Sequence, residues 1–341
     1  MFAMLLSFQV LAGQEWKLVW SDEFDGEALD LEKWSFQTGT GAEYGLTDWG
    51  NNEEQYYREE NVAVADSVLI ITAKEEQFGG KSYTSGRIRT MDKGDWKYGR
   101  MEIRARMPVG KGLWAALWMM PTDSDYGGWA ASGEIDIVEY LGSEPCKVYG
   151  TLHFGGGWPN NDKKGVEYPL SQGKFNEDFH TFALEWEEGK MRWYVDDTHY
   201  QTLGRGDWWS EGGPFPAPFD KRFHLLINLA VGGWWPGSPD ASTEFPQELV
   251  VDYVRIYEAD TTNTGSPARE DITVSALRQN SPNPFRSVTN ISYTLGTEEH
   301  VVLEVFDALG RKVETLVDGV RMPGTYTEVM QAGSLSPGLY T

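Results

Sequence analysis

The sequence predicts an all-β fold in which two antiparallel sheets pack face to face as a sandwich. Two observations lead to this prediction. Short runs of β-branched, aromatic and other apolar residues recur along residues 1–258, with Gly, Pro, Asn and Asp in the gaps between them. Apolar residues at helical spacing are nearly absent. Many short strands without helices are typical of β-sandwiches.

The N-terminal segment, residues 1–13, is apolar but too short to cross a bilayer as a helix. It resembles the hydrophobic region of a secretory signal, with Ala12 or Gly13 as the small residue at a cleavage site. The basic segment that usually precedes such a region is absent, so a buried first strand is the alternative. We expect a secreted or cell-surface bacterial protein. No other stretch is long and apolar enough to span a membrane.

Residues 14–258 are expected to form one large domain. The clearest predicted strands cover residues 62–64, 69–73, 100–107, 147–154, 179–186, 191–195, 223–229 and 250–257. Asp196 and Asp197 lie between two such runs and predict a hairpin turn, so we give these acids no catalytic role.

A polar stretch without periodicity, residues 259–276, predicts a linker. The remaining residues, 277–341, predict a small immunoglobulin-like β domain. They include Asn-Ser-Pro-Asn-Pro-Phe at 280–285 and resemble the C-terminal sorting domain of type IX secretion, although a generic immunoglobulin-like module is the alternative. This resemblance implies the secretion machinery as a partner. Such a domain normally continues into another strand, so we expect the tail to be truncated or to depart from the pattern.

Composition narrows the classes of partner. The net charge of −23 argues against nucleic acid and anionic membranes, and it disfavours a heavily sulfated polysaccharide. A neutral glucan is indifferent to this charge. Cys146 is the single cysteine, so no intrachain disulfide can form. Aromatic residues make up 13% of the chain and can serve either sugar stacking or the core.

The chemistry is concentrated at residues 133–140, Gly-Glu-Ile-Asp-Ile-Val-Glu-Tyr. Side chains alternate along a strand, so Glu134 and Asp136 share a face and Glu139 has the wrong parity. One extra residue, a β-bulge, would return Glu139 to that face. A row of three acids contains the two carboxylates that the hydrolysis of a glycosidic bond requires. An acidic edge strand and a calcium loop are the alternatives, but the intervening Ile and Val residues fit neither well.

The motif Glu-Ile-Asp-Ile-Val-Glu resembles the signature of glycoside hydrolase family 16 in its bulged form, as found in laminarinases; the regular form of lichenases lacks the extra residue. Eight further blocks match in the family's order. They are Trp-Ser-Asp-Glu-Phe at 20–24, Trp-Gly-Asn-Asn-Glu at 49–53 with Gln-Tyr-Tyr at 55–57, Thr-Ser-Gly-Arg at 84–87, Gly-Leu-Trp-Ala-Ala-Leu-Trp at 112–118, Gly-Thr-Leu-His-Phe at 150–154, Asn-Leu-Ala-Val-Gly-Gly at 228–233, Trp-Pro-Gly at 235–237 and Val-Asp-Tyr-Val-Arg-Ile-Tyr at 251–257.

The resemblance implies a jelly roll whose concave sheet carries the substrate cleft. It also implies an endo-acting β-1,3-glucanase that retains anomeric configuration, with Glu134 as nucleophile, Glu139 as acid/base and Asp136 hydrogen-bonded to the nucleophile. Mixed-linkage glucan or a galactan such as agarose remains an alternative substrate. A non-catalytic glucan-binding lectin is an alternative of another class, although known binding relatives lose the catalytic Glu residues.

His153 lies in the strand predicted after residues 133–140, and an antiparallel pairing of the two is expected to place it near Glu139, with a structural histidine as the alternative. Further roles come from the resemblance. Trp114 and Trp118 would be sugar platforms rather than core residues. Arg87 would bind sugar hydroxyls or hold the catalytic acids in an ion pair.

Four loop positions also match the family or depart from it. Asn51 matches a sugar-binding position, and Trp235 matches the Trp of the usual Asn-Trp-Pro-Gly loop. Trp234 replaces the Asn of that loop and is expected to bind substrate and to alter a glucose-binding subsite. Glu54 replaces a Leu, and its role stays open.

No zinc signature is present, and catalysis is expected to need no cofactor. The resemblance places a structural Ca²⁺ on the convex side, with Glu23 and Asp252 among its ligands. Ordinary surface acids are the alternative.

Overall fold

The structure is a computed structural model that describes residues 16–260, 276–277, 280, 288–295, 299–307, 311–321 and 324–331. The chain folds into two compact units. One is formed by Trp16–Asp260, and the other contains the described residues after 275. The signal expected at residues 1–13, most of the linker and most of residues 280–285 lie outside the described residues. No helix among the described residues is long and apolar enough to cross a membrane.

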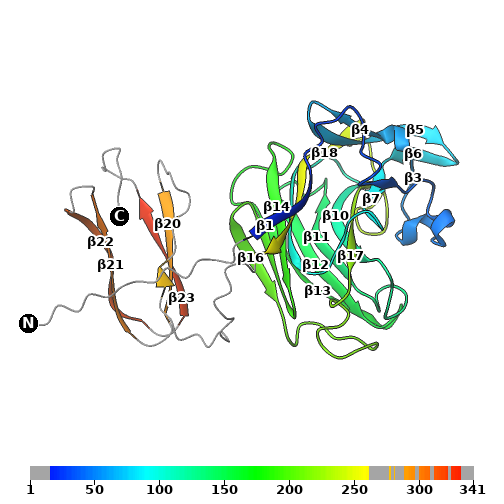
Figure 1. Cartoon of the computed structure of the whole chain (residues 1–341). Helices are drawn as coiled ribbons and strands as arrows, with labels where there is room; N and C mark the ends of the chain where they lie inside the picture. The colour runs from blue at the N-terminus through cyan, green and yellow to red at the C-terminus, as the bar shows by residue number, and fades with distance from the viewer. Residues whose placement is uncertain are drawn as a thin grey trace, which may run out of the picture. The chain divides into compact units, whose positions relative to one another are not determined.

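The larger unit is the predicted two-sheet sandwich (Figure 1). Sheet A has ten strands: β16 (Thr198–Leu203), β15 (Lys190–Val195), β14 (His180–Glu187), β9 (Gly99–Arg106), β18 (Gln247–Ala259), β5 (Val68–Phe78), β6 (Lys81–Ser85) and β3 (Gln55–Tyr57) in order, with β1 (Trp16–Asp22) on β18 and β4 (Val62–Ala65) on β5. Sheet B has eight: β13 (Asn161–Pro169), β12 (Lys147–Gly155), β11 (Glu134–Leu141), β10 (Leu113–Pro121), β17 (Phe223–Val231), β7 (Arg87–Arg89) and β2 (Ser35–Phe36) in order, with β8 (Asp95–Trp96) on β17. Three single 3₁₀ turns precede β5: η1 (Ala42–Tyr44), η2 (Asp48–Gly50) and η3 (Glu59–Asn61).

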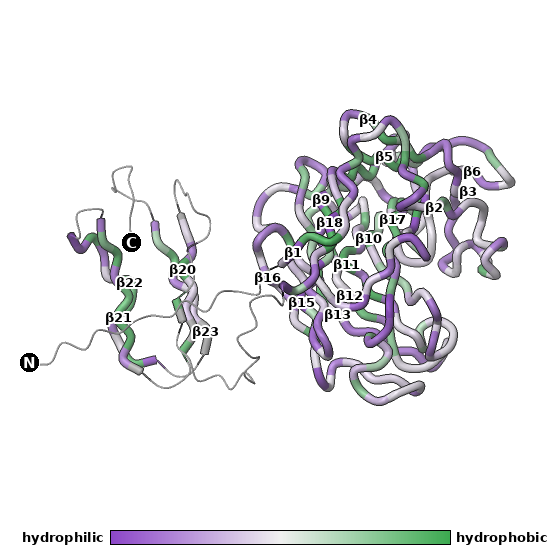
Figure 2. The backbone as a smooth tube through the Cα atoms, viewed as in Figure 1, coloured by the Kyte–Doolittle hydropathy of each residue, from purple (hydrophilic) through white to green (hydrophobic). Residues whose placement is uncertain are grey.

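The core lies between the two sheets because their strands alternate in polarity. Alternate residues of β9 are buried, and Figure 2 shows the change of hydropathy along such strands. Met101 and Ile103 of sheet A, with Leu117, Ile135 and Leu152 of sheet B, belong to one buried cluster. Burial of each such side chain stabilises the fold by about 1.5–3 kcal/mol. Because the core face supplies this stability, the opposite face of sheet B can carry polar groups.

The described elements of the smaller unit are also β-strands, which agrees with the predicted fold class. β19 (Ala276–Leu277), β20 (Val288–Leu295) and β23 (Gly324–Gln331) form one sheet, and β21 (Glu299–Phe306) pairs with β22 (Lys312–Arg321). Tyr293, Leu295 and Val317 form its small core.

Candidate active site

The predicted bulge is present in β11, which lies between β10 and β12 in sheet B (Figure 1). Val138 pairs with Leu117 of β10, whereas Asp136 pairs with the next residue, Trp118. Ile137 is therefore the extra residue of the bulge. Both Ile137 and Val138 are buried in the core, as expected where one residue is inserted.

The bulge brings the three acids onto one face of sheet B. Their partners on β12 are His153 for Glu134, Thr151 for Asp136 and Tyr149 for Glu139. These three partners are spaced two residues apart, so their side chains lie on the same face.

The sequence analysis placed His153 near Glu139, but in the structure His153 lies beside Glu134. Its Nε2 is 3.6 Å from Glu134 Oε1 and 3.4 Å from Asp136 Oδ2. The expectation was wrong because the register of β12 pairs His153 with Glu134, four residues beyond the partner of Glu139. The histidine therefore supplies a nearby cation to the first two acids.

Burial and mutual repulsion set the charge states of this row. Burial, then the charge of Asp136, raises the pKa of Glu134 to about 7, while His153 opposes this shift. Burial, then Asp136 and Glu134, raises the pKa of Glu139 well above its usual value. Burial would lower the pKa of His153, but the neighbouring carboxylates outweigh it and raise the pKa to about 9. His153 is consequently protonated at neutral pH.

Trp114 and Trp118 share the face of the acids, because they alternate with the buried Leu113, Ala115 and Leu117 along β10. Both are partly exposed. The Trp118 indole N–H donates to Asn228 Oδ1 at 2.8 Å.

Arg87 is buried beside these rings. Its guanidinium carbon lies 4.5 Å from the Trp49 ring centroid and 4.9 Å from that of Trp118, and its Nε donates to Gln37. These contacts place the cation close to two aromatic rings. Among the described ion pairs, none joins Arg87 to an acid of β11.

Asn51 belongs to a polar group that the sequence did not reveal. The buried carboxylate of Glu53 accepts hydrogen bonds from Gln55 (2.7 Å), Tyr57 (3.1 Å) and Asn51 (3.2 Å). Burial raises the pKa of Glu53, and the charge of Arg87 opposes this. Asn228 completes the group by donating to the Tyr57 hydroxyl at 3.1 Å.

The loop after β17 presents two tryptophans. Trp234 is 78% exposed and Trp235 is 43% exposed. The Trp235 ring packs edge-on against Trp114 at 5.5 Å and against Tyr149 at 5.0 Å. The backbone N–H of Trp234 donates to the carbonyl of Asn51, so the loop is joined to the segment that carries Glu53.

The departure at Glu54 has a structural explanation. A Cβ on Gly232 would lie 2.5 Å from the Glu54 side chain, so the glycine leaves room for it. Ser238 donates a hydrogen bond to the Glu54 carboxylate. Glu54 therefore contacts both ends of the loop that carries Trp234 and Trp235, at Gly232 and at Ser238.

Trp129 and Trp158 are further site residues that the sequence analysis did not identify. The Trp129 indole N–H donates to Glu134 Oε2 at 2.8 Å, and its ring lies 5.6 Å from His153. Trp158 is 75% exposed and lies 6.4 Å from Trp129, next to glycines 155–157. An exposed tryptophan after a run of glycines was the available signal.

The expected calcium ligands are both engaged with arginines. Glu23 accepts two hydrogen bonds from Arg255, and Asp252 pairs with Arg104. A guanidinium cation occupies the oxygens that a Ca²⁺ ion would need, so this arrangement does not fit the ion. Binding of Ca²⁺ at Glu23 and Asp252 would require both arginines to move away from the carboxylates.

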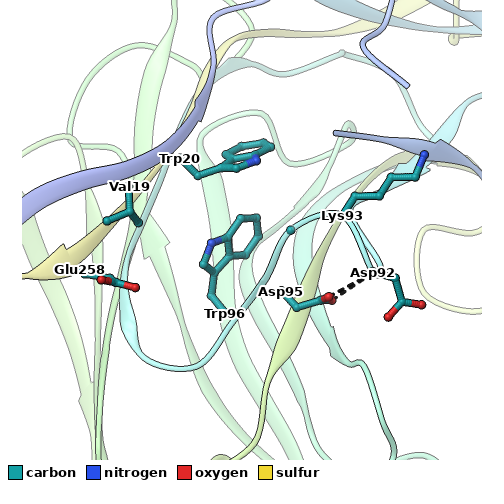
Figure 3. A pocket seen from close by; sticks show the side chains of 8 residues that line it. Val19, Trp20, Asp92, Lys93, Asp95, Trp96 and Glu258 are labelled. Atoms are coloured by element: carbon teal, nitrogen blue, oxygen red, sulfur yellow. Dashed lines mark hydrogen bonds between the residues drawn. The ribbon is translucent and has the colours of Figure 1, made fainter. Parts of the chain in front are cut away.

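A separate pocket lies at β1 and β8 and contains none of the acids of β11 (Figure 3). Trp20 and Trp96 lie edge-on to each other in it, at 5.3 Å. Two of its charged groups have partners of their own, since Lys93 donates to the carbonyl of Trp34 and Asp95 accepts from Thr122. We assign this pocket no role.

A row of three acids on a β-sandwich, flanked by aromatic rings, is the arrangement expected of an enzyme that hydrolyses polysaccharides. The chain belongs to glycosyl hydrolases family 16, whose family model matches residues 49–255, and it is a glycoside hydrolase.

Two curated relatives are each 43% identical in alignments of 261 positions that cover 71% of this chain. One is the glucan endo-1,3-beta-glucosidase A1 of Niallia circulans, of which the match covers 38%, and the other is a beta-glucanase of Rhodothermus marinus, of which it covers 85%. The crystal structure of the laminarinase catalytic domain of Thermotoga maritima is also similar. It shares 43% identity at a TM-score of 0.66, covering 72% of this chain and 99% of that chain.

Proposed function

We propose that this protein is a secreted, endo-acting, retaining β-glucanase that hydrolyses β-1,3-glucosidic bonds of laminarin-type polysaccharides. The observation that carries the proposal is the bulged strand, which sets Glu134 and Glu139 on one face. The β-1,3 preference is supported by relatives named as endo-1,3-glucosidase and laminarinase. The net charge of −23 also disfavours a sulfated galactan as the alternative substrate.

In this mechanism Glu134 attacks the anomeric carbon as a carboxylate. The N–H of Trp129 and the cation of His153 stabilise its ionised form. Asp136 lies between the two glutamates and shares the positive charge of His153. A retaining enzyme needs its two carboxyl groups about 5–5.5 Å apart, without room for a water molecule between them.

Glu139 donates a proton to the leaving oxygen and then removes one from the incoming water. Burial and the charges of Asp136 and Glu134 raise its pKa, which keeps it protonated in the free enzyme. Once the bond to Glu134 has formed, one negative charge is lost from the row. Glu139 then ionises more readily and can act as the base.

Substrate and mechanism can be tested with one set of variants. Laminarin should be hydrolysed fastest, mixed-linkage glucan more slowly and carrageenan negligibly. Glu134→Gln should leave only background turnover, and Glu139→Gln should be rescued by azide with a β-glycosyl azide as product. Glu248→Gln, on an exposed position of sheet A, is the matched control.

Three outcomes would contradict the proposal. Faster hydrolysis of agarose than of laminarin would overturn the substrate, and an α-anomer as first product by NMR would overturn retention. Glucan binding without release of reducing ends would favour a lectin.

Secretion through residues 277–341 is a separate part of the proposal, supported by the linker-like sequence at 259–276 and the division of the chain after Asp260. A chain ending at Asp260 should keep full activity on soluble glucan but remain inside a type IX-secreting host. A tenfold loss of activity in the folded shorter chain would assign the tail to catalysis instead.

A further inference from the structure

The bulge in β11 is held from the opposite sheet. Trp193 of β15 lies in sheet A and is fully buried. Its indole N–H donates to the backbone carbonyl of Asp136 at 2.9 Å, directly before the inserted Ile137. A bulge disrupts the ladder locally, so a carbonyl next to it needs a partner from elsewhere.

The neighbouring strand leaves room for this contact. A Cβ on Gly150 of β12 would lie 2.6 Å from Trp193 Cδ1 and 2.5 Å from the Tyr200 hydroxyl. The backbone of Gly150 has no positive φ, so an alanine there is excluded by space and not by conformation. Gln201 donates to the Gly150 carbonyl at 3.3 Å and fixes the strand at this point.

We propose that Trp193 is a positioning residue that holds the bulge and so directs Glu139 toward the substrate. Glu134 and Asp136 precede the bulge and keep their ladder partners on β12 in any case. Glu139 follows the bulge, and a slip of one residue would turn its side chain toward the core. The inference rests on the proposed role of Glu139 as acid/base.

The test uses Trp193→Phe, which keeps an aromatic ring in the core but removes the donor. Losing a hydrogen bond worth about 1–1.5 kcal/mol that holds the acid should lower kcat/KM on laminarin about tenfold. On an aryl β-laminaribioside with a good leaving group, kcat/KM should fall less than threefold, because that step needs little protonation. KM for laminarin should change less than twofold.

Two further variants keep the test decisive. Gly150→Ala displaces the indole and should reproduce the same dependence on the leaving group, but should add little in the Trp193→Phe background. Trp34→Phe is the matched control, because Trp34 is equally buried and donates to Asp22. It should lose stability without any dependence on the leaving group.

Equal losses on both substrates would show that Trp193 only supports the core, and unchanged activity on laminarin would also overturn the inference. If Trp193→Phe does not fold, Gly150→Ala decides by the same criteria. Failure of the proposed function looks different, because wild-type enzyme would then not hydrolyse laminarin, or Glu139→Gln would lack the leaving-group dependence.

Discussion

Replacing His153 with glutamine should move the whole pH–activity profile toward alkaline pH. In the native enzyme the pKa of His153 is raised to about 9, so a cation faces Glu134 at 3.6 Å throughout the neutral range. His153→Gln keeps a polar side chain but removes the charge. Without that charge the carboxylate form of Glu134 is less stable, so its pKa rises.

The distance sets the size of the shift. Two unit charges 3.6 Å apart interact by about 4.5 kcal/mol at an effective dielectric constant of about 20. One pKa unit corresponds to about 1.4 kcal/mol, so the shift cannot exceed about three units. Because both side chains keep some contact with water, we expect a shift of about one to two units. From a starting pKa of about 7, Glu134 would be only about 1–10% ionised at pH 7.

The assay is kcat/KM on laminarin between pH 5 and pH 10, which reports the ionisations of the free enzyme. Activity at pH 7 should fall about 5–50-fold and recover above pH 9. His180→Gln is the matched control, because His180 pairs with Asp196 at 3.0 Å on sheet A. An acid limb that stays in place, with only a uniform loss of activity, would refute the electrostatic role of His153.

Three other outcomes follow from the same contacts. Burial raises the folded-state pKa of Glu134 from 4.5 to about 7, so stability is lost as the pH rises from about 4.5 to 7 and the loss is complete above pH 7. Urea unfolding of Glu134→Gln should therefore show a gain of about 2–3 kcal/mol at pH 8 and none at pH 4. Trp158→Ala should raise KM for laminarin about 3–10-fold with kcat nearly unchanged, since an exposed ring would bind the substrate equally in the ground state and the transition state. An unchanged KM would show that Trp158 does not contact the substrate. A chelator should leave the thermal midpoint unchanged, whereas a drop of several degrees that Glu23→Ala abolishes would restore the calcium hypothesis.

The sandwich and the bulge could be predicted because both depend on local periodicity. Polarity alternating every second residue identifies strands, and the wrong parity of Glu139 next to two consecutive apolar residues identifies the insertion. The partners of the acids depend on register between strands instead. The sequence did not fix that register, which is why His153 was expected beside the wrong glutamate.

Contacts made by loop residues also could not be predicted from the sequence. Trp129 reaches Glu134 from the loop that precedes β11, and Arg87 lies close to rings from two separate elements. No spacing rule connects such residues, because the chain between them turns through irregular structure. Glu53 was visible as an acid in a matching block, but its burial and its three donors were not.

The position of β11 within sheet B explains why the bulge is the point of control. Neighbours pair with this strand on both sides, so it cannot slide as a whole without breaking two ladders. The three acids nevertheless repel one another, and a single histidine lies among them. If the bulge were lost and the register slipped by one residue, Glu139 would turn away from the other two acids and the repulsion would be relieved. Only the segment after Asp136 would be disturbed. The indole N–H of Trp193 in sheet A donates to the carbonyl of Asp136, where such a slip would begin, and so opposes it. Packing of Trp193 in the core therefore helps to set the direction of the Glu139 side chain.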